Sequence, residues 1–253
     1  MTNLKTTDGR ALAPKISSSM TIASNLTAIR ERIASAALRA GRNTSDVALM
    51  AVSKTQSADS IIEAYHAGQR LLGENRIQEF ADKFPLLAEL KDAEFHMIGH
   101  LQSNKTAKAA EIFRAVDSID SAKLALRLND ATEKLGKTLD ILIEINIGGE
   151  EAKSGIAPGD PELESILTRA LDWPHLRIRG LMTVPPFTED PDGARPYFRK
   201  LRELRDRLAG RNLPAVTLDV LSMGMSHDFQ VAIEEGSTCV RIGTAIFGTR
   251  PQP

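Results

Sequence analysis

Lys54 is the residue whose position in this sequence points most directly to chemistry. It follows the apolar run VALMAVS, which is typical of a parallel strand buried on both faces. An amine held at such a strand end is partly desolvated, which lowers its pKa and makes it a nucleophile toward carbonyl groups. A lysine that snorkels from a strand end into solvent has the same local sequence. Position alone therefore leaves both interpretations open.

Two later segments have the composition of an anion-binding site. SMGMS places glycine and two hydroxyl residues, Ser222 and Ser226, in one tight loop. RIGT places Gly243 and Thr244 at the start of a predicted helix. Free backbone N–H groups and small hydroxyl side chains are the donors that bind phosphate. Each segment alone is also compatible with an ordinary turn or helix cap, but together they indicate a phosphate site.

The other side chains that could do chemistry also have structural interpretations. Arg241, within the last apolar run, either enters the site as a permanent charge or pairs with a carboxylate. His96 and His100 have no third metal ligand in register, so they indicate structural or solvent-facing histidines. Cys239 is interpreted as a small core residue. The basic run over 195–207 is interleaved with acidic residues and is typical of a solvated helix face.

A parallel sheet would bring these positions to one edge. Eight short apolar runs predict strands, over 47–53, 70–72, 94–99, 114–118, 138–147, 176–184, 217–222 and 239–243. A helical pattern follows each run, and another over 24–42 precedes the first. Eight such α/β units over about 205 residues predict a (β/α)8 TIM barrel, with functional residues at the C-terminal ends of the strands. The rival fold is a doubly wound sheet, which normally carries GxGxxG after its first strand, where this chain has AVSKTQ.

Length and composition limit the number of domains and the kinds of partner that this protein can have. We expect a flexible N-terminal tail over 1–19 and a single domain over 20–253. The formal net charge is -1 and aromatic residues make up 4%, which argues against nucleic acid or an anionic membrane as the main partner. No apolar run reaches the roughly 18 residues of a membrane span. One cysteine cannot form an internal disulfide, which is compatible with the cytoplasm.

Taken together, seven ordered motifs resemble the pyridoxal phosphate homeostasis protein family, whose barrel is similar to the N-terminal barrel of alanine racemase. The motifs are AVSKTQ, GENRIQE, HMIGHLQSNK, the KSG of EEAKSG, IRGLMTVPP, LSMGMSHDFQVAI and GSTCVRIGTAIFG. The resemblance runs from about residue 25 to 250. It implies that the cofactor is pyridoxal 5'-phosphate (PLP), that Lys54 forms the internal aldimine, and that Arg241 faces the pyridine nitrogen. The other cofactor-binding residues it implies are Asn75 near the ring, Met225 in the pocket wall, and Ser222, Ser226, Gly243 and Thr244 around the phosphate.

The resemblance also bears on catalysis. An always-protonated arginine at the pyridine nitrogen disfavours the pyridinium form and weakens the electron sink. Alanine racemase has a second domain that supplies a tyrosine base, whereas this chain has only Tyr65 and Tyr197, neither at a predicted strand end. We therefore expect a non-catalytic protein that holds PLP and buffers it or delivers it to PLP-dependent apoenzymes, as a monomer. The alternatives are a low-activity PLP-dependent amino-acid racemase and a cofactor-free Schiff-base aldolase.

Overall fold

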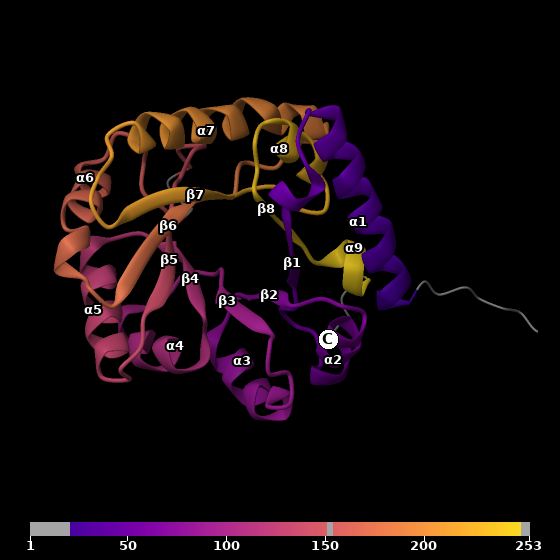
Figure 1. The fold of residues 1–253 in the computed structure, drawn as a ribbon, viewed down its shortest axis with the longest axis horizontal. Coiled ribbons are helices and arrows are strands. Elements are labelled where there is room, and N and C mark those ends of the chain that lie inside the picture. The colour runs from indigo at the N-terminus through magenta and orange to yellow at the C-terminus, as the bar shows by residue number, and fades with distance from the viewer. Residues whose placement is uncertain (1–20, 151–153, 249–253) are drawn as a thin grey trace, which may run out of the picture.

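The sheet of this protein is a closed barrel of eight parallel strands. The strands are β1 (Ala48–Val52), β2 (Leu71–Glu74), β3 (Glu94–Met97), β4 (Ala115–Ile119), β5 (Leu139–Glu144), β6 (Leu176–Met182), β7 (Val216–Ser222) and β8 (Cys239–Ile242). Each pairs with the next along the chain, and β8 pairs with β1 (Figure 1). The computed structural model describes residues 21–150 and 154–248, so the tail expected over 1–19 lies outside the described residues. The predicted (β/α)8 barrel is confirmed, and every predicted run overlaps one strand.

Helices alternate with the strands and form the outer ring. They are α1 (Ile22–Arg39), α2 (Ala58–His66), α3 (Ile77–Lys83), α4 (Thr106–Ile112), α5 (Ala122–Glu133), α6 (Pro161–Thr168), α7 (Arg195–Ala209), α8 (Phe229–Glu234) and α9 (Thr244–Phe247). Short 3₁₀ turns cover Thr44–Asp46, Phe84–Leu87, Ser103–Lys105, Ala170–Asp172 and Pro191–Ala194. Four helices, α1, α2, α5 and α6, begin at capping residues: the side chains of Thr21, Ser57, Ser121 and Asp160 each accept a hydrogen bond from a backbone N–H of the first turn. None of the described helices is both long enough and apolar enough to cross a membrane.

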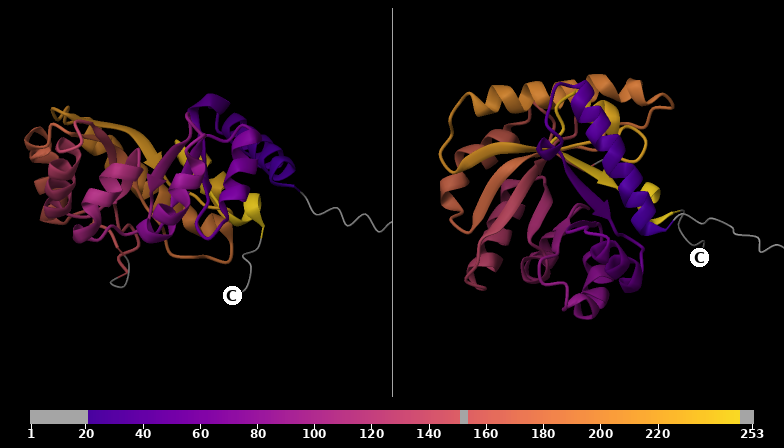
Figure 2. Two further views of the ribbon diagram at one scale, coloured as in Figure 1. Left: turned by 90° about the horizontal axis from the view of Figure 1, so that it is seen from below. Right: turned by 45° about the vertical axis from the view of Figure 1, so that its right-hand side comes forward.

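The extra N-terminal helix, α1, covers the place where the barrel closes. The last two helices, α8 and α9, are short, so they leave part of the outer face of β8 and β1 without cover. Leu26, Ile29 and Ile33 of α1 are buried in one apolar cluster with Phe229 and Ile246. Figure 2 shows α1 running beside the C-terminal segment. This helix is therefore part of the outer ring and not an appendage.

The barrel interior is unusually polar for a protein core. A cavity of about 190 Å³ lies inside its N-terminal half. His96 and Asp117 line it, with His96 Nδ1 3.1 Å from Asp117 Oδ1. Burial lowers the pKa of His96, but Asp117 outweighs this effect and leaves that pKa raised. Cys239 also lines the cavity, and burial raises its pKa to about 12, which fits an inert core thiol.

Among the described residues, no group of histidine, cysteine and carboxylate side chains could hold a metal ion.

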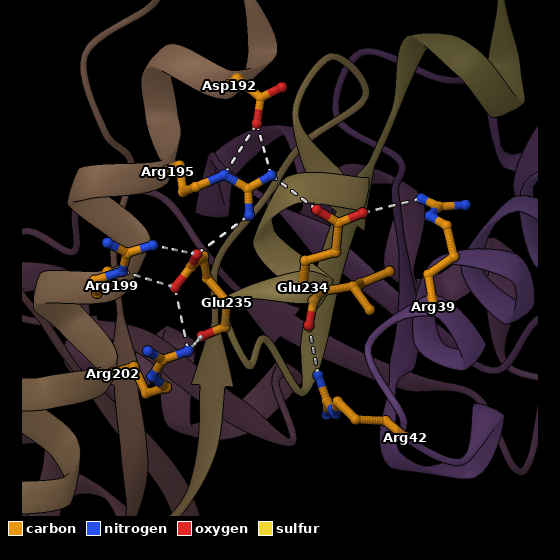
Figure 3. Close-up of polar contacts among 9 residues, drawn as sticks. Arg39, Arg42, Asp192, Arg195, Arg199, Arg202, Glu234 and Glu235 are labelled. Atoms are coloured by element: carbon orange, nitrogen blue, oxygen red, sulfur yellow. Dashed lines mark hydrogen bonds and ion pairs between the residues drawn. The ribbon is translucent and has the colours of Figure 1, made fainter.

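The basic run of α7 differs in part from the solvated face that we expected. Arg195, Arg199 and Arg202 all bind the carboxylate of Glu235, at 3.2, 3.0 and 3.1 Å respectively. Arg195 also binds Glu234, so these contacts join α7 to the end of α8 (Figure 3). Burial would raise the pKa of Glu235, but the arginines outweigh burial and lower it. The arginines are needed here to compensate a buried carboxylate.

Gly180 marks the closest approach between β6 and β7. A Cβ atom at this position would lie 1.9 Å from the carbonyl oxygen of Val220, and the register of the two strands shifts beside it. We expect Gly180→Ala to lower the free energy of unfolding by about 3 kcal/mol, because the backbones must separate to admit the methyl group. Urea denaturation measures this change. Gly159 has no atoms within 4 Å, so Gly159→Ala is the matched control; equal effects of the two substitutions would contradict the prediction.

Candidate functional site

The predicted amine lies near the barrel mouth, at the C-terminal ends of the strands. Lys54 is the second residue after β1 and is half-buried. The side chain of Ser53 points outward toward α3, where its Oγ donates to Glu74 Oε1 at 2.7 Å. Because side chains alternate along a strand, the next residue, Lys54, falls on the barrel side. Thr55 then turns the chain sharply, with a positive φ of 64°.

A buried ion pair fixes the segment that carries Lys54. Glu74 is fully buried, and Lys83 Nζ lies 3.0 Å from its Oε1. Lys83 also donates to the carbonyl oxygens of Ser53 and Gln56, at 3.4 and 3.2 Å. Burial raises the pKa of Glu74, while Lys83 opposes the rise. The pair ties α3 and β2 to the turn after β1 and so restricts where the Lys54 backbone can lie.

Asn75 lies at the neighbouring strand end. It follows β2, and its Oδ1 is buried without a hydrogen-bond partner among the described residues. A Cβ atom at Gly99 would lie 2.3 Å from the Asn75 carbonyl oxygen, so a glycine is needed where these two loops meet. A pocket of about 420 Å³ opens beside Asn75, with Arg76, His100 and Lys105 also in its wall. Its unpartnered amide oxygen fits a polar ligand at the mouth.

The loop after β7 is held in one conformation by its own side chains. Gly224 has a φ of 94°, and a Cβ atom there would lie 2.5 Å from the Cβ of Ala232. The Met225 N–H donates to Asp228 Oδ1 at 2.6 Å. Burial raises the pKa of Asp228. Met225 and Ser226 are half-buried at the surface of this loop, where they can reach a bound group.

The loop after β8 brings the second predicted anion-binding segment against the end of β1. Gly243 precedes α9, and its carbonyl accepts from the N–H groups of Ile246 and Phe247, at 2.9 and 3.0 Å. A Cβ atom on Gly243 would lie 3.3 Å from the Val52 carbonyl oxygen, at the end of β1. Thr244 is exposed beside it. The N–H groups of a first helical turn have no partner within the helix, so they are available to an anion.

Arg241 and Ser222 lie deeper in the barrel than these loops. The Arg241 guanidinium is almost fully buried and donates to Ser222 Oγ and to the Thr183 carbonyl oxygen, both at 2.7 Å. Burial lowers its pKa, but a guanidinium remains charged. The Ser222 hydroxyl oxygen is thus engaged by Arg241, and its own proton remains as a donor. The pair sits between the interior cavity and the mouth.

Glu144 is a site residue that we did not predict. The expected strand over 138–147 ends at Glu144, because Ile145 forms an isolated bridge with Ile156 instead. The carboxylate is buried, and its Oε2 has no hydrogen-bond partner among the described residues. Burial and Asp120 raise the pKa of Glu144 to about 7, against the opposing effect of Arg241. Strand alternation from Asp140 could have shown that this carboxylate enters the mouth.

The predicted residues lie on neighbouring strands. Barrel order places β7, β8, β1 and β2 side by side, and these four strands and the loops after them carry Ser222, Met225, Ser226, Arg241, Gly243, Thr244, Lys54 and Asn75. The structure therefore combines an amine, a buried guanidinium and two glycine-containing loops on one half of the mouth. This donor set fits a ligand that carries a carbonyl group and a phosphate. Glu144 lies on the other half.

A family model and a curated relative both match almost the whole chain. The sequence model described as "Alanine racemase, N-terminal domain" matches residues 24–251. A protein of Aquifex aeolicus named pyridoxal phosphate homeostasis protein is 45% identical over 231 residues, which cover 91% of this chain and 99% of that protein.

Two solved structures of PipY from Synechococcus elongatus have the same fold. The one without PLP has a TM-score of 0.80 and 36% identity, and the match covers 90% of this chain and all of the other. The one with PLP bound has a TM-score of 0.74 and 38% identity, and the match covers 87% of this chain and all of the other.

The buried ion pair between Glu74 and Lys83 can be tested by removing its cation. We expect Lys83→Met to lower the free energy of unfolding by about 3 kcal/mol at neutral pH, because the Glu74 carboxylate stays buried without its cation. The folded-state pKa of Glu74 then rises further, so the deficit relative to wild type should shrink as the pH falls and the carboxyl is protonated. Urea denaturation at several pH values measures both effects.

The double variant Glu74→Gln/Lys83→Met is the control, since it removes both charges. It should recover much of the lost stability and lose the added pH dependence. A deficit in Lys83→Met that is the same at every pH would show that the carboxylate is not its cause.

Proposed function

Because this chain belongs to the alanine racemase N-terminal domain family and, by its closer relatives, to the pyridoxal phosphate homeostasis proteins, we propose that it binds PLP at the barrel mouth. It holds PLP through Lys54, limits the free aldehyde and passes the cofactor on. The observation that carries the proposal is the contact between the ends of β1 and β8. That contact sets Gly243 against Val52, two residues before Lys54, and so supports one ligand that reaches both the amine and the Gly243 loop.

Each predicted residue has a defined part in holding the cofactor. PLP supplies a reactive aldehyde and an electron-withdrawing ring when bound. Lys54 is the amine that retains the aldehyde end. The loops with Ser226 and Gly243 donate N–H and hydroxyl groups to the phosphate, while Met225 packs in the wall. In this proposal Asn75 lies near the ring, which is supported by its buried Oδ1 that has no partner among the described residues.

Arg241 favours storage over catalysis in this proposal. A guanidinium beside the ring nitrogen cannot accept a proton from it and repels a second positive charge, so the ring stays unprotonated. Both tyrosines lie on helices of the outer ring: Tyr65 on α2 donates to Asp92, and Tyr197 lies on α7. Neither is placed to move a proton at the mouth. A racemase of low activity is the second candidate, since Lys54 alone can exchange a proton on one face.

We also propose that the recipients are PLP-dependent apoenzymes and that the protein acts as a cytoplasmic monomer. The barrel closes within one chain, and each strand has two neighbours from that chain. The side chains in the rim pocket beside Asn75 are largely exposed, which leaves an acceptor room to approach the site. Light scattering at micromolar and higher concentrations tests the monomer directly.

Lys54→Ala tests the covalent attachment. We expect wild-type protein mixed with PLP to gain the visible absorbance of a lysine adduct and, after borohydride reduction, to yield one labelled peptide that contains Lys54. The variant should lose both signals. Lys108→Ala, which removes an exposed lysine paired with Glu111 on α4, is the matched control and should behave as wild type. Labelling that persists at another lysine in Lys54→Ala would contradict the assignment.

Exchange in deuterated water tests whether the protein is a catalyst. We expect PLP-loaded protein incubated with L-amino acids to produce no D-enantiomer, because two-sided proton transfer needs a base on each face of the substrate. Chiral chromatography and mass spectrometry measure inversion and α-deuterium separately. Inversion that is lost in Lys54→Ala would establish the racemase and overturn the storage role.

A further inference from the structure

We propose that Glu144 controls how tightly the mouth retains PLP: the site binds the cofactor with this carboxyl protonated and weakens when it ionises. The inference rests on the proposed function and adds a residue on the wall opposite Lys54. In a closed ring of eight strands β5 lies opposite β1, so the strand end that carries Glu144 and the strand end that precedes Lys54 lie on opposite sides of the mouth.

The Glu144 side chain is directed inward by its neighbours. Ile143 and Ile145 are fully buried in the apolar cluster between strands and helices, so the residue between them faces the barrel. Gly155 covers it from above: a Cβ atom there would lie 3.1 Å from Glu144 Cγ, and the Ile156 N–H donates to the Glu144 carbonyl at 2.8 Å. The carboxyl is held in place and shielded from water.

The charges around this carboxyl do not fully compensate it. Asp120 repels a negative charge on Glu144, while Arg241 and His100 attract it. His100 is itself paired with Asp120, with Nδ1 3.2 Å from Oδ2, and the Arg241 guanidinium already donates to two oxygens. The charged groups that act on Glu144 from the surrounding elements are therefore Asp120, His100 and Arg241, and Asp117 and Asp228 act in turn on Arg241.

A phosphate in the mouth adds negative charge to this setting. It carries close to two negative charges at neutral pH, and like charges in a poorly solvated site disfavour each other. Binding therefore raises the pKa of Glu144 above its value of about 7 in the empty site. Because Glu144 has a higher pKa in the bound state, binding of PLP is accompanied by uptake of a proton. The affinity for PLP therefore falls as the pH rises from the pKa of Glu144 in the empty site toward its pKa in the occupied site.

Glu144→Gln is the direct test, since the amide keeps the shape and stays neutral. PLP dissociation constants are measured by equilibrium dialysis for wild type and variant from about pH 6 to about pH 9. The ratio of the wild-type constant to the variant constant removes every pH dependence that the two proteins share. We expect a ratio near one at the acid end that rises to roughly a hundredfold at the alkaline end, for a unit charge about 10 Å from a phosphate of nearly two charges at an effective dielectric of about 20.

Asp140→Asn is the matched control. Asp140 is on the same strand at the other end of the barrel, paired with Arg177, and its ratio to wild type should not change with pH. A second measurement needs no variant: in wild-type protein enriched with ¹³C at glutamate carboxyl carbons, one resonance should titrate near neutral pH and move to higher pH when PLP is added.

The outcomes separate the two proposals. PLP binding with a Glu144→Gln ratio that stays flat, or without a glutamate resonance that moves, overturns the role of Glu144 and leaves the holding function standing. Wild-type protein that binds no PLP at any pH overturns both. A rising ratio together with the moved resonance supports the inference.

Discussion

The pairing of β8 with β1 is the contact on which the rest of this molecule depends. It closes the barrel and sets Met50 opposite Arg241 in register, although these residues are far apart along the chain. The same closure brings Gly243 against Val52 at the end of β1, two residues before Lys54. The helical layer is thin over this seam, and α1 completes it. The same strand pairing therefore closes the barrel, forms the seam that α1 covers and brings the predicted site residues of β8 and β1 together.

Buried charge is the second constraint, and each buried charged group is compensated in a different way. Glu74 is matched by Lys83 outside the strands, and Glu235 is matched by arginines of α7. Arg241, inside the barrel, donates to neutral oxygens. Glu144 keeps one carboxylate oxygen without a hydrogen-bond partner among the described residues, and burial raises its pKa to about 7. Under the proposed function, a group that changes charge in that range would affect how an anion is held and released.

The fold and half of the mouth were predictable from the sequence, because they follow from local patterns. Apolar runs, helical periodicity and the motifs around Lys54 and Gly243 all report on short stretches of chain. Glu144 was missed because its role depends on where β5 ends, and that end is decided by a bridge to Ile156 after an intervening loop. The arginines of α7 were misjudged for a similar reason: a carboxylate on another helix decides whether they are only solvated.

The position of α1 has a consequence for how the chain folds during synthesis. This helix leaves the ribosome before any strand, yet its packing partners Phe229, Ile233 and Ile246 are among the last residues made. Val47, Ala51 and Ala64 of the same cluster are made early, so only part of the apolar face of α1 is covered until the last strand and helices form. Contacts of such long sequence separation form slowly, and exposed apolar surface invites association with other chains. The outer layer of the barrel is therefore completed only when both ends of the chain are present.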